Sequence, residues 1–160
     1  MARSTRDVSV ELFVRSLSPS DGPVARNVYR LRALESRDRI ERGRVVVWGR
    51  EIDLSQTVRT SAPGRFFLDR VATFRSWAAD RDVTIEPFFG TREVHCSITG
   101  EEYATLTLPV CCLAEYHDGS LQHVVPHSDG RVSCGVEDRL ATLAEGDAPG
   151  FEADGEIART

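Results

Sequence analysis

The chain contains no lysine, and all 20 of its basic residues are arginines. Arginine is more weakly hydrated than lysine, and its planar guanidinium pairs with carboxylates through two hydrogen bonds. Such a bias suits a protein that works in a salt-rich cell interior, and a GC-rich genome would give the same bias. The sequence does not distinguish between these two explanations for the absence of lysine.

Long apolar runs and a secretory signal are also absent. No run approaches the roughly 18 apolar residues that a membrane-spanning helix needs, and the N-terminus, MARSTRDVSVELF, is charged and then alternates. The 160 residues, 41% of them hydrophobic, suffice for one domain with a substantial core. We expect a cytoplasmic protein without a membrane partner, in which residues 1–145 form one domain and residues 146–160 form a flexible acidic tail.

Motifs for catalysis are missing. The sequence has no G-x-S-x-G, no P-loop and no G-x-G-x-x-G. Residues 127–129 include the types of a Ser-His-Asp triad, but neighbours on one segment cannot form its hydrogen-bonded line. No C-x-x-C occurs, so reduced thiols are expected at Cys96, Cys111, Cys112 and Cys134. We predict a non-enzymatic protein that requires no cofactor.

The apolar patterns predict alternating strands and helices. Alternation over residues 8–15 indicates a strand, a helix begins at Pro23 and covers residues 23–39, and a β-favouring run begins at Val45, so the three form a parallel crossover unit. Further elements are a helix over residues 63–79, strands over 83–89, 92–98 and 130–133, and a short helix over 136–143. We predict an α/β single-domain two-layer sandwich, with a mixed sheet of about five or six strands, two main helices and a short C-terminal helix.

An Asp118-Gly119 pair between two apolar runs predicts a β-hairpin, because both central residues of a type I′ turn need a positive φ. If these two residues form the loop, His123 lies opposite Ala114 on the returning strand. Residues 106–116 are expected to turn every second side chain toward the core. Pro126 cannot donate to a ladder, so the returning strand is expected at an edge of the sheet.

The hairpin also carries candidate metal ligands. In the register above, Cys112 is diagonal to both His123 and His127 on one face, and zinc sites use such side chains. The two histidines are roughly 13 Å apart along a straight strand at about 3.3 Å per residue, so both reach one ion only if Pro126 bends the chain. The alternative is a buried Cys112 that acts as a small hydrophobic residue.

Charge is divided unevenly along the chain. Residues 1–75 have 15 Arg and 9 acidic residues, a net charge of +6, whereas residues 76–160 have 5 Arg and 16 acidic residues, a net charge of −11. Residues 26–50 alone have 8 Arg against 3 acidic residues. Arginine contacts phosphates and guanine edges, so candidate nucleic-acid-binding residues are Arg26, Arg30, Arg37, Arg42, Arg44 and Arg50. The alternative is a solvated helix face on which many of these residues pair with acids.

Several segments resemble a family of small haloarchaeal proteins that are labelled as containing a helix-turn-helix domain. They are VVVWGREI (45–52), EPFFGTREVHCSITGEEY (86–103), LPVCCLAEYHDGSLQHVVPHSDG (108–130) and VEDRLATL (136–143). The resemblance extends from Val8 to Leu143 and implies DNA binding and transcriptional regulation. A DNA-binding regulator is thus the leading hypothesis. The alternatives are a protein-interaction module that forms a homodimer and a metal- or thiol-sensing protein.

Overall fold

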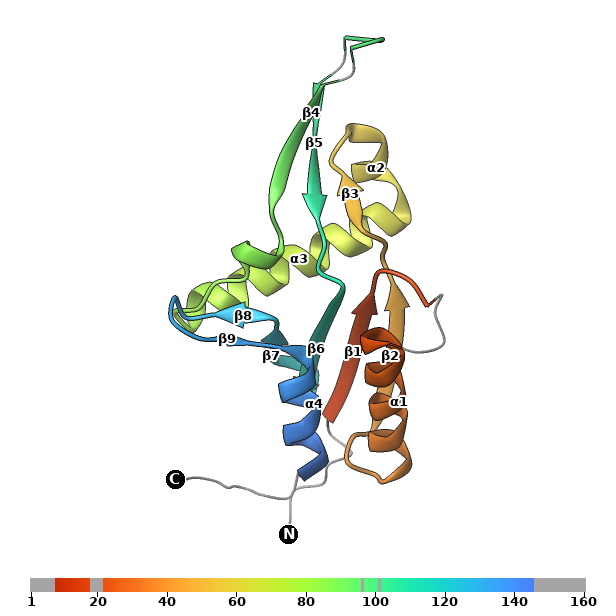
Figure 1. The fold of residues 1–160 in the computed structure, drawn as a ribbon, viewed down its shortest axis with the longest axis vertical. Helices are drawn as coiled ribbons and strands as arrows, with labels where there is room; N and C mark the ends of the chain where they lie inside the picture. Colours follow the sequence, from red (N-terminus) through yellow and green to blue (C-terminus); the bar gives the residue numbers. More distant parts are fainter. Residues whose placement is uncertain (1–7, 18–21, 96, 101, 146–160) are drawn as a thin grey trace.

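A four-stranded sheet with helices on both faces forms the centre of the molecule. The computed structural model describes residues 8–17, 22–95, 97–100 and 102–145, and the expected tail lies outside them. The central sheet has the order β2-β1-β6-β7, a second sheet has the order β3-β5-β4, and β8 pairs with β9. Figure 1 shows α1 and α4 in front of the central sheet and α3 behind it.

The strands are β1 (Val8–Val14), β2 (Arg42–Val47), β3 (Glu51–Asp53), β4 (Thr91–His95), β5 (Glu102–Thr107), β6 (Cys111–His117), β7 (Ser120–Val125), β8 (His127–Ser128) and β9 (Ser133–Cys134). The helices are α1 (Pro23–Ser36), α2 (Gln56–Thr60), α3 (Ala62–Asp80), the 3₁₀ turn η2 (Glu86–Phe88) and α4 (Val136–Glu145). Within the described residues, none of these helices combines the length and the apolar character that a bilayer span requires.

The elements β1, α1 and β2 form the parallel crossover that the sequence predicts, since Val10 lies beside Gly43 in a parallel ladder. Gly43 lies directly beneath α1, and a Cβ atom there would be 2.7 Å from the Cγ atom of Leu31. Only glycine lets the helix approach the strand so closely. The helix begins at Pro23 as expected and ends at Ser36, earlier than the predicted residue 39.

Strands β1 and β6 are buried on both faces. Leu12 packs with α1 and α4, whereas the next residue, Phe13, packs with α3. On β6 the neighbours Cys112 and Leu113 are both 0% exposed. The single α/β domain is therefore confirmed, but it has a helical layer on each side of the sheet in place of one, because both faces of the strands are apolar.

The β6–β7 hairpin has the predicted turn. Asp118 and Gly119 have φ values of 54° and 84°, and Tyr116 pairs with Leu121 as the two-residue loop requires. Strand β7 lies at the edge of the central sheet, as expected from the proline that follows it. The Asp-Gly signal therefore located the turn, and Pro126 indicated the edge strand.

Farther from the turn, the predicted register is wrong by one residue. The ladder shifts between Glu115 and Tyr116, so that His123 pairs with Glu115 and Gln122 has no partner on β6. The extra residue is a β-bulge, and the carbonyl oxygen of Gln122 accepts a hydrogen bond of 3.1 Å from the indole Nε1 of Trp77 on α3. Residues 123–125, which follow the bulge on β7, therefore face the opposite side from the one predicted.

The alternating segment over residues 106–116 is divided between two strands rather than forming one. β5 ends at Thr107 in the second sheet, and β6 begins at Cys111 in the central sheet. The predicted strand over residues 83–89 is wrong, because this segment contains the 3₁₀ turn η2 and only a single bridge, between Thr84 and Ser128.

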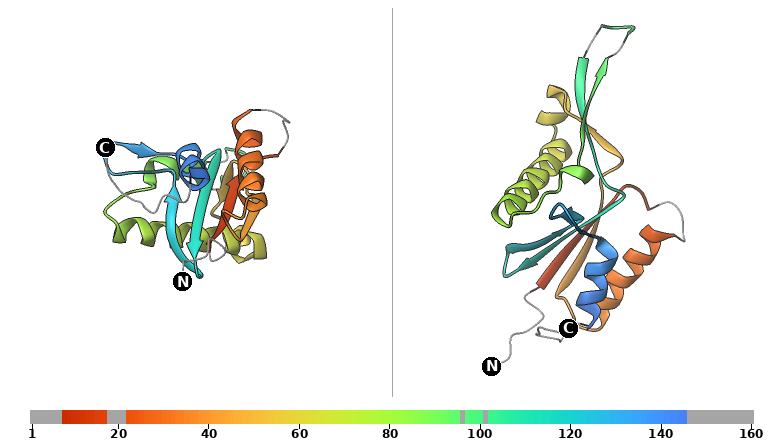
Figure 2. Two further views of the ribbon diagram at one scale, coloured as in Figure 1. Left: turned by 90° about the horizontal axis from the view of Figure 1, so that it is seen from below. Right: turned by 60° about the vertical axis from the view of Figure 1, so that its left-hand side comes forward.

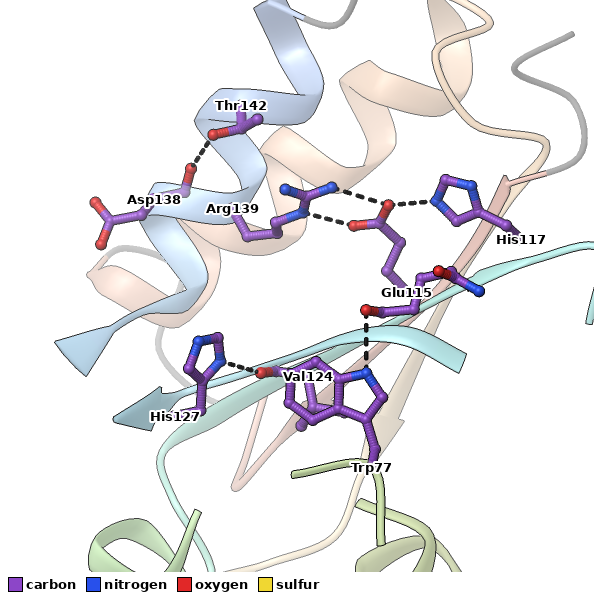
Figure 3. A network of polar contacts seen from close by, with 9 residues as sticks. Trp77, Glu115, His117, Val124, His127, Asp138, Arg139 and Thr142 are labelled. Atoms are coloured by element: carbon purple, nitrogen blue, oxygen red, sulfur yellow. Dashed lines mark hydrogen bonds and ion pairs between the residues drawn. The ribbon is translucent and has the colours of Figure 1, made fainter. Parts of the chain in front are cut away.

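One buried carboxylate on each face of the central sheet holds a helix. On the α3 face, Arg70 donates from Nε and Nη2 to both oxygens of Glu11 at 3.0 and 2.8 Å, and the Tyr116 hydroxyl donates to the same carboxylate at 3.0 Å. On the opposite face, Arg139 of α4 donates to both oxygens of Glu115 at 2.6 and 3.0 Å (Figure 3). Glu115 is 0% exposed, so its charge depends on this partner.

The replacement Arg139→Met is expected to lower the free energy of unfolding by about 3–5 kcal/mol, because it leaves the Glu115 carboxylate buried without its main partner. The double variant Glu115→Leu with Arg139→Met removes both charges and is expected to lose clearly less. Urea unfolding of the three proteins at pH 7 measures this difference. Equal losses in the single and double variants would contradict the role given to the ion pair.

Candidate nucleic-acid interface

A short helix directly precedes the long helix α3. Helix α2 ends at Thr60 and α3 begins at Ala62, so Ser61 alone separates them. The backbone N–H and the Oγ of Ser61 donate to the carbonyl oxygen of Val58 at 3.1 and 2.8 Å, and Oγ accepts from the N–H of Gly64 at 3.1 Å. One serine therefore ends the first helix and caps the second.

Gly64 brings the two helices into contact. It is buried in the first turn of α3, and a Cβ atom built on it would lie 1.9 Å from the carbonyl oxygen of Val58. No larger residue fits there without a backbone shift. The end of α2 is thus packed directly against the start of α3.

A small sheet supports this helix pair. β3 precedes α2, whereas β4 and β5 follow α3, and the three strands pair in the order β3-β5-β4. The N–H of Leu54 donates to the carbonyl oxygen of Ala104 at 2.8 Å, which extends the pairing to the start of α2. In Figure 1 the β4–β5 hairpin projects beyond the core, beside α2.

A groove of about 430 Å³ lies where the helix pair meets this sheet, and its lining includes Arg59, Arg65, Asp69 and Arg75. Arg75 pairs with Glu86 at 3.0 Å. Arg59 and Arg65 are exposed, and no carboxylate in the described part of the chain forms an ion pair with either of them. The two guanidinium groups are therefore available to a ligand with negative charge.

One known protein family matches nearly the whole chain. The matching family is described as a helix-turn-helix domain, and the match covers residues 2–148. The chain belongs to this family. No curated protein and no solved structure matches it. Membership indicates a DNA-binding regulatory role in general, in a class of domain that is typically non-enzymatic.

The sequence patterns predict the second helix of the α2–α3 pair but not the first. Ser61 and Pro63 mark the start of α3. Helix α2 has only five residues, which is too few to show a 3.6-residue period. The local signal for α2 is Ser55, which directly precedes it, as Ser61 directly precedes α3.

The six arginines predicted to bind nucleic acid lie on two other parts of the domain. Arg26, Arg30 and Arg37 are exposed on α1 or at its end, and Arg42, Arg44 and Arg50 are exposed on β2 or after it. Arg44 is partly engaged, since its guanidinium lies 3.8 Å from Glu11 and 5.6 Å from the centre of the Phe66 ring. None of the six belongs to α2 or α3.

The three candidate metal ligands are not brought together. Cys112 is buried on the α3 side of the sheet, whereas His123 lies opposite Glu115 and therefore faces α4. His127 Nδ1 is 2.6 Å from the Val124 carbonyl oxygen (Figure 3). Among the described residues, no group of three His, Cys, Asp or Glu side chains is arranged to hold a metal ion. The bulge at Gln122 separates Cys112 from His123.

The thiols on β6 lie in surroundings that lower their reactivity. Burial raises the pKa of Cys112 well above its usual value, and burial also raises the pKa of Cys111. Because the thiolate is the reactive form, a raised pKa lowers reactivity. Cys112 acts here as a small hydrophobic residue, in agreement with the alternative given for it from the sequence.

Replacement of Gly64 by Ala is expected to destabilise the domain by about 3 kcal/mol, because the added Cβ collides with the backbone of α2. Gly90→Ala is the matched control, since a Cβ there meets nothing within 4 Å and the residue does not need a positive φ. Thermal and urea unfolding of both variants test this expectation. A Gly64→Ala protein as stable as the control would show that α2 is not held against α3.

His123 is expected to make the domain less stable as the pH falls. Burial, with the charge of Arg139 as a second cause, lowers its pKa to about 4. Because the unfolded chain then binds the proton more tightly, stability is full above an unfolded pKa of about 6.5 and is lost as the pH falls toward the folded pKa. We expect His123→Gln to reduce the loss between pH 7 and pH 5 by about 1 kcal/mol, a figure discounted for partial exposure of the ring. Urea unfolding at both pH values measures it, and identical pH dependence in the two proteins would contradict it.

Proposed function

We propose that the protein is a non-enzymatic, DNA-binding transcriptional regulator that contacts DNA through α2 and the first turns of α3. The observation that carries the proposal is the coincidence of a helix-turn-helix family match with two consecutive helices joined at Ser61. In helix-turn-helix proteins the second helix enters the major groove, and its N-terminal residues contact base edges. The corresponding residues here begin at Ala62.

The first turn of α3 suits close approach to a duplex. Ala62 and Pro63 are exposed and small, so they do not hold the helix away from the bases. Arg59 and Arg65 flank them from the two helices. Residues 54–79 have 4 Arg against 1 Asp, a net charge of +3, although the whole chain has a net charge of −5. Local positive charge of this kind favours phosphate contacts.

The projecting hairpin is a poorer candidate for phosphate contacts. Arg92 pairs with Glu51 at 2.9 Å, and His95 lies 3.4 Å from Glu102. Glu93 adds a further negative charge to β4. Because like charges repel, we infer that phosphates approach the helix pair rather than this hairpin.

The arginines on α1 form an alternative surface. They lie on the far side of the central sheet from α3, so one duplex that follows α3 does not meet them in the same copy of the protein. The absence of lysine suits a haloarchaeal member of the family, in which close contacts matter more than long-range attraction, because the Debye length in molar salt is only about 3 Å.

The replacements Arg59→Ala and Arg65→Ala are each expected to weaken DNA binding and to reduce the slope of log K against log salt by about 0.9 per lost phosphate contact. Fluorescence anisotropy with labelled genomic fragments across a salt series measures both quantities. Arg26→Ala is the matched control, an exposed arginine on α1 that should leave affinity and slope unchanged.

Two outcomes would overturn the proposal. Loss of binding in the Arg26→Ala protein, with unchanged binding in the other two, would move the interface to α1. No binding by the folded wild-type protein at any salt concentration would remove the DNA-binding function itself. Circular dichroism of each variant confirms that the fold is retained.

A further inference from the structure

The outer surface of the α1 and α4 pair has an apolar groove of about 310 Å³, and its lining includes Tyr29, Ala33, Ala141 and Ala144. Tyr29 is 75% exposed. Tyrosine is enriched at surfaces that bind another protein, since the ring brings much apolar area, and the small alanines beside it leave room for a helix to come close. The groove therefore suits a partner that has an apolar helical surface.

The charges around this groove are sorted by helix. Arg30 and Arg37 line it on the α1 side, and neither forms an ion pair with any described carboxylate. Helix α4 has Glu137, Asp138 and Glu145, and the only basic residue of this helix is turned inward to the buried carboxylate on β6. One rim of the groove is thus basic and the other helix is acidic.

We propose that this surface joins two copies of the chain into a homodimer. Figures 1 and 2 show α1 and α4 side by side and running in the same direction. A two-fold axis parallel to the helices places α1 of each copy over α4 of the other, so that basic and acidic residues meet twice. An axis perpendicular to the helices would place α1 over α1 and bring like charges together. The charge pattern selects the first arrangement.

The levels of the charged residues also agree with a parallel axis. Asn27, near the start of α1, donates from Nδ2 to Cys111 Sγ at 3.6 Å, and Figure 1 shows α1 and α4 starting at a similar level along the sheet, so Asn27 and the start of α4 lie at similar heights. Arg30 is one helical turn beyond Asn27. A parallel axis keeps these heights, so Arg30 of one copy meets the Glu137 end of α4 in the other.

The dimer leaves the DNA-binding surface free. Helices α1 and α4 cover one face of the central sheet, and α3 covers the other. Both α3 helices of a dimer would therefore point away from the dimer interface. The dimer does not depend on the proposed function, and its test involves no DNA.

Sedimentation equilibrium over a concentration series tests the dimer. The wild-type chain is expected to be dimeric, and Arg30→Glu and Glu137→Arg should each weaken association at least about tenfold, because each change opposes like charges across the interface. The double variant with both changes exchanges the signs and should restore association. Arg131→Glu, an exposed change away from the groove, is the control.

Tyr29→Ser provides a second test that does not rely on charge. The ring is exposed in the single chain, so the variant should fold normally, as thermal unfolding would check, and should associate more weakly. A wild-type chain that remains monomeric at every concentration would overturn the proposal. A dimer that neither Tyr29→Ser nor Arg30→Glu weakens would also overturn it, since the interface would then lie elsewhere.

Discussion

Two buried carboxylates, one on each face of the central sheet, determine the positions of helices α3 and α4. Glu11 holds α3 through Arg70, and Glu115 holds α4 through Arg139, in each case by two parallel hydrogen bonds. The planar guanidinium makes such two-point contacts, whereas the ammonium of lysine offers a single point charge. A chain whose basic residues are all arginines is well suited to attach helices in this way.

The same attachment links the core to the candidate interface. Helix α3 starts at the turn with α2 and continues along the central sheet, where Phe74 and Trp77 are buried. Ala62, Pro63 and Arg65 at its start are thus exposed while its later turns are anchored. A helix that is fixed along most of its length presents its exposed end with little freedom, and less entropy is then lost on binding.

Sequence patterns predicted the elements with strong local signals and failed where tertiary contacts decide. The cap at Ser61, the crossover from β1 to β2 and the Asp118-Gly119 turn were all visible as local chemistry. The bulge was not visible, because the Trp77 indole that binds the Gln122 carbonyl is distant in sequence. Helix α2 was missed for a related reason, since its five residues are stabilised by contact with Gly64 and not by their own periodicity.

The bulge also shows how little separates two different chemical surfaces in this fold. With Gln122 bulged out of the ladder, His123 shares a face with Glu115, and the opposite face near Cys112 stays apolar. If Gln122 instead paired with Glu115 in a regular ladder, His123 would turn toward the thiol side and Val124 toward α4, since side chains alternate along a strand. The bulge therefore decides which face of β7 is polar and which is apolar, and one hydrogen bond from a distant tryptophan accompanies that choice.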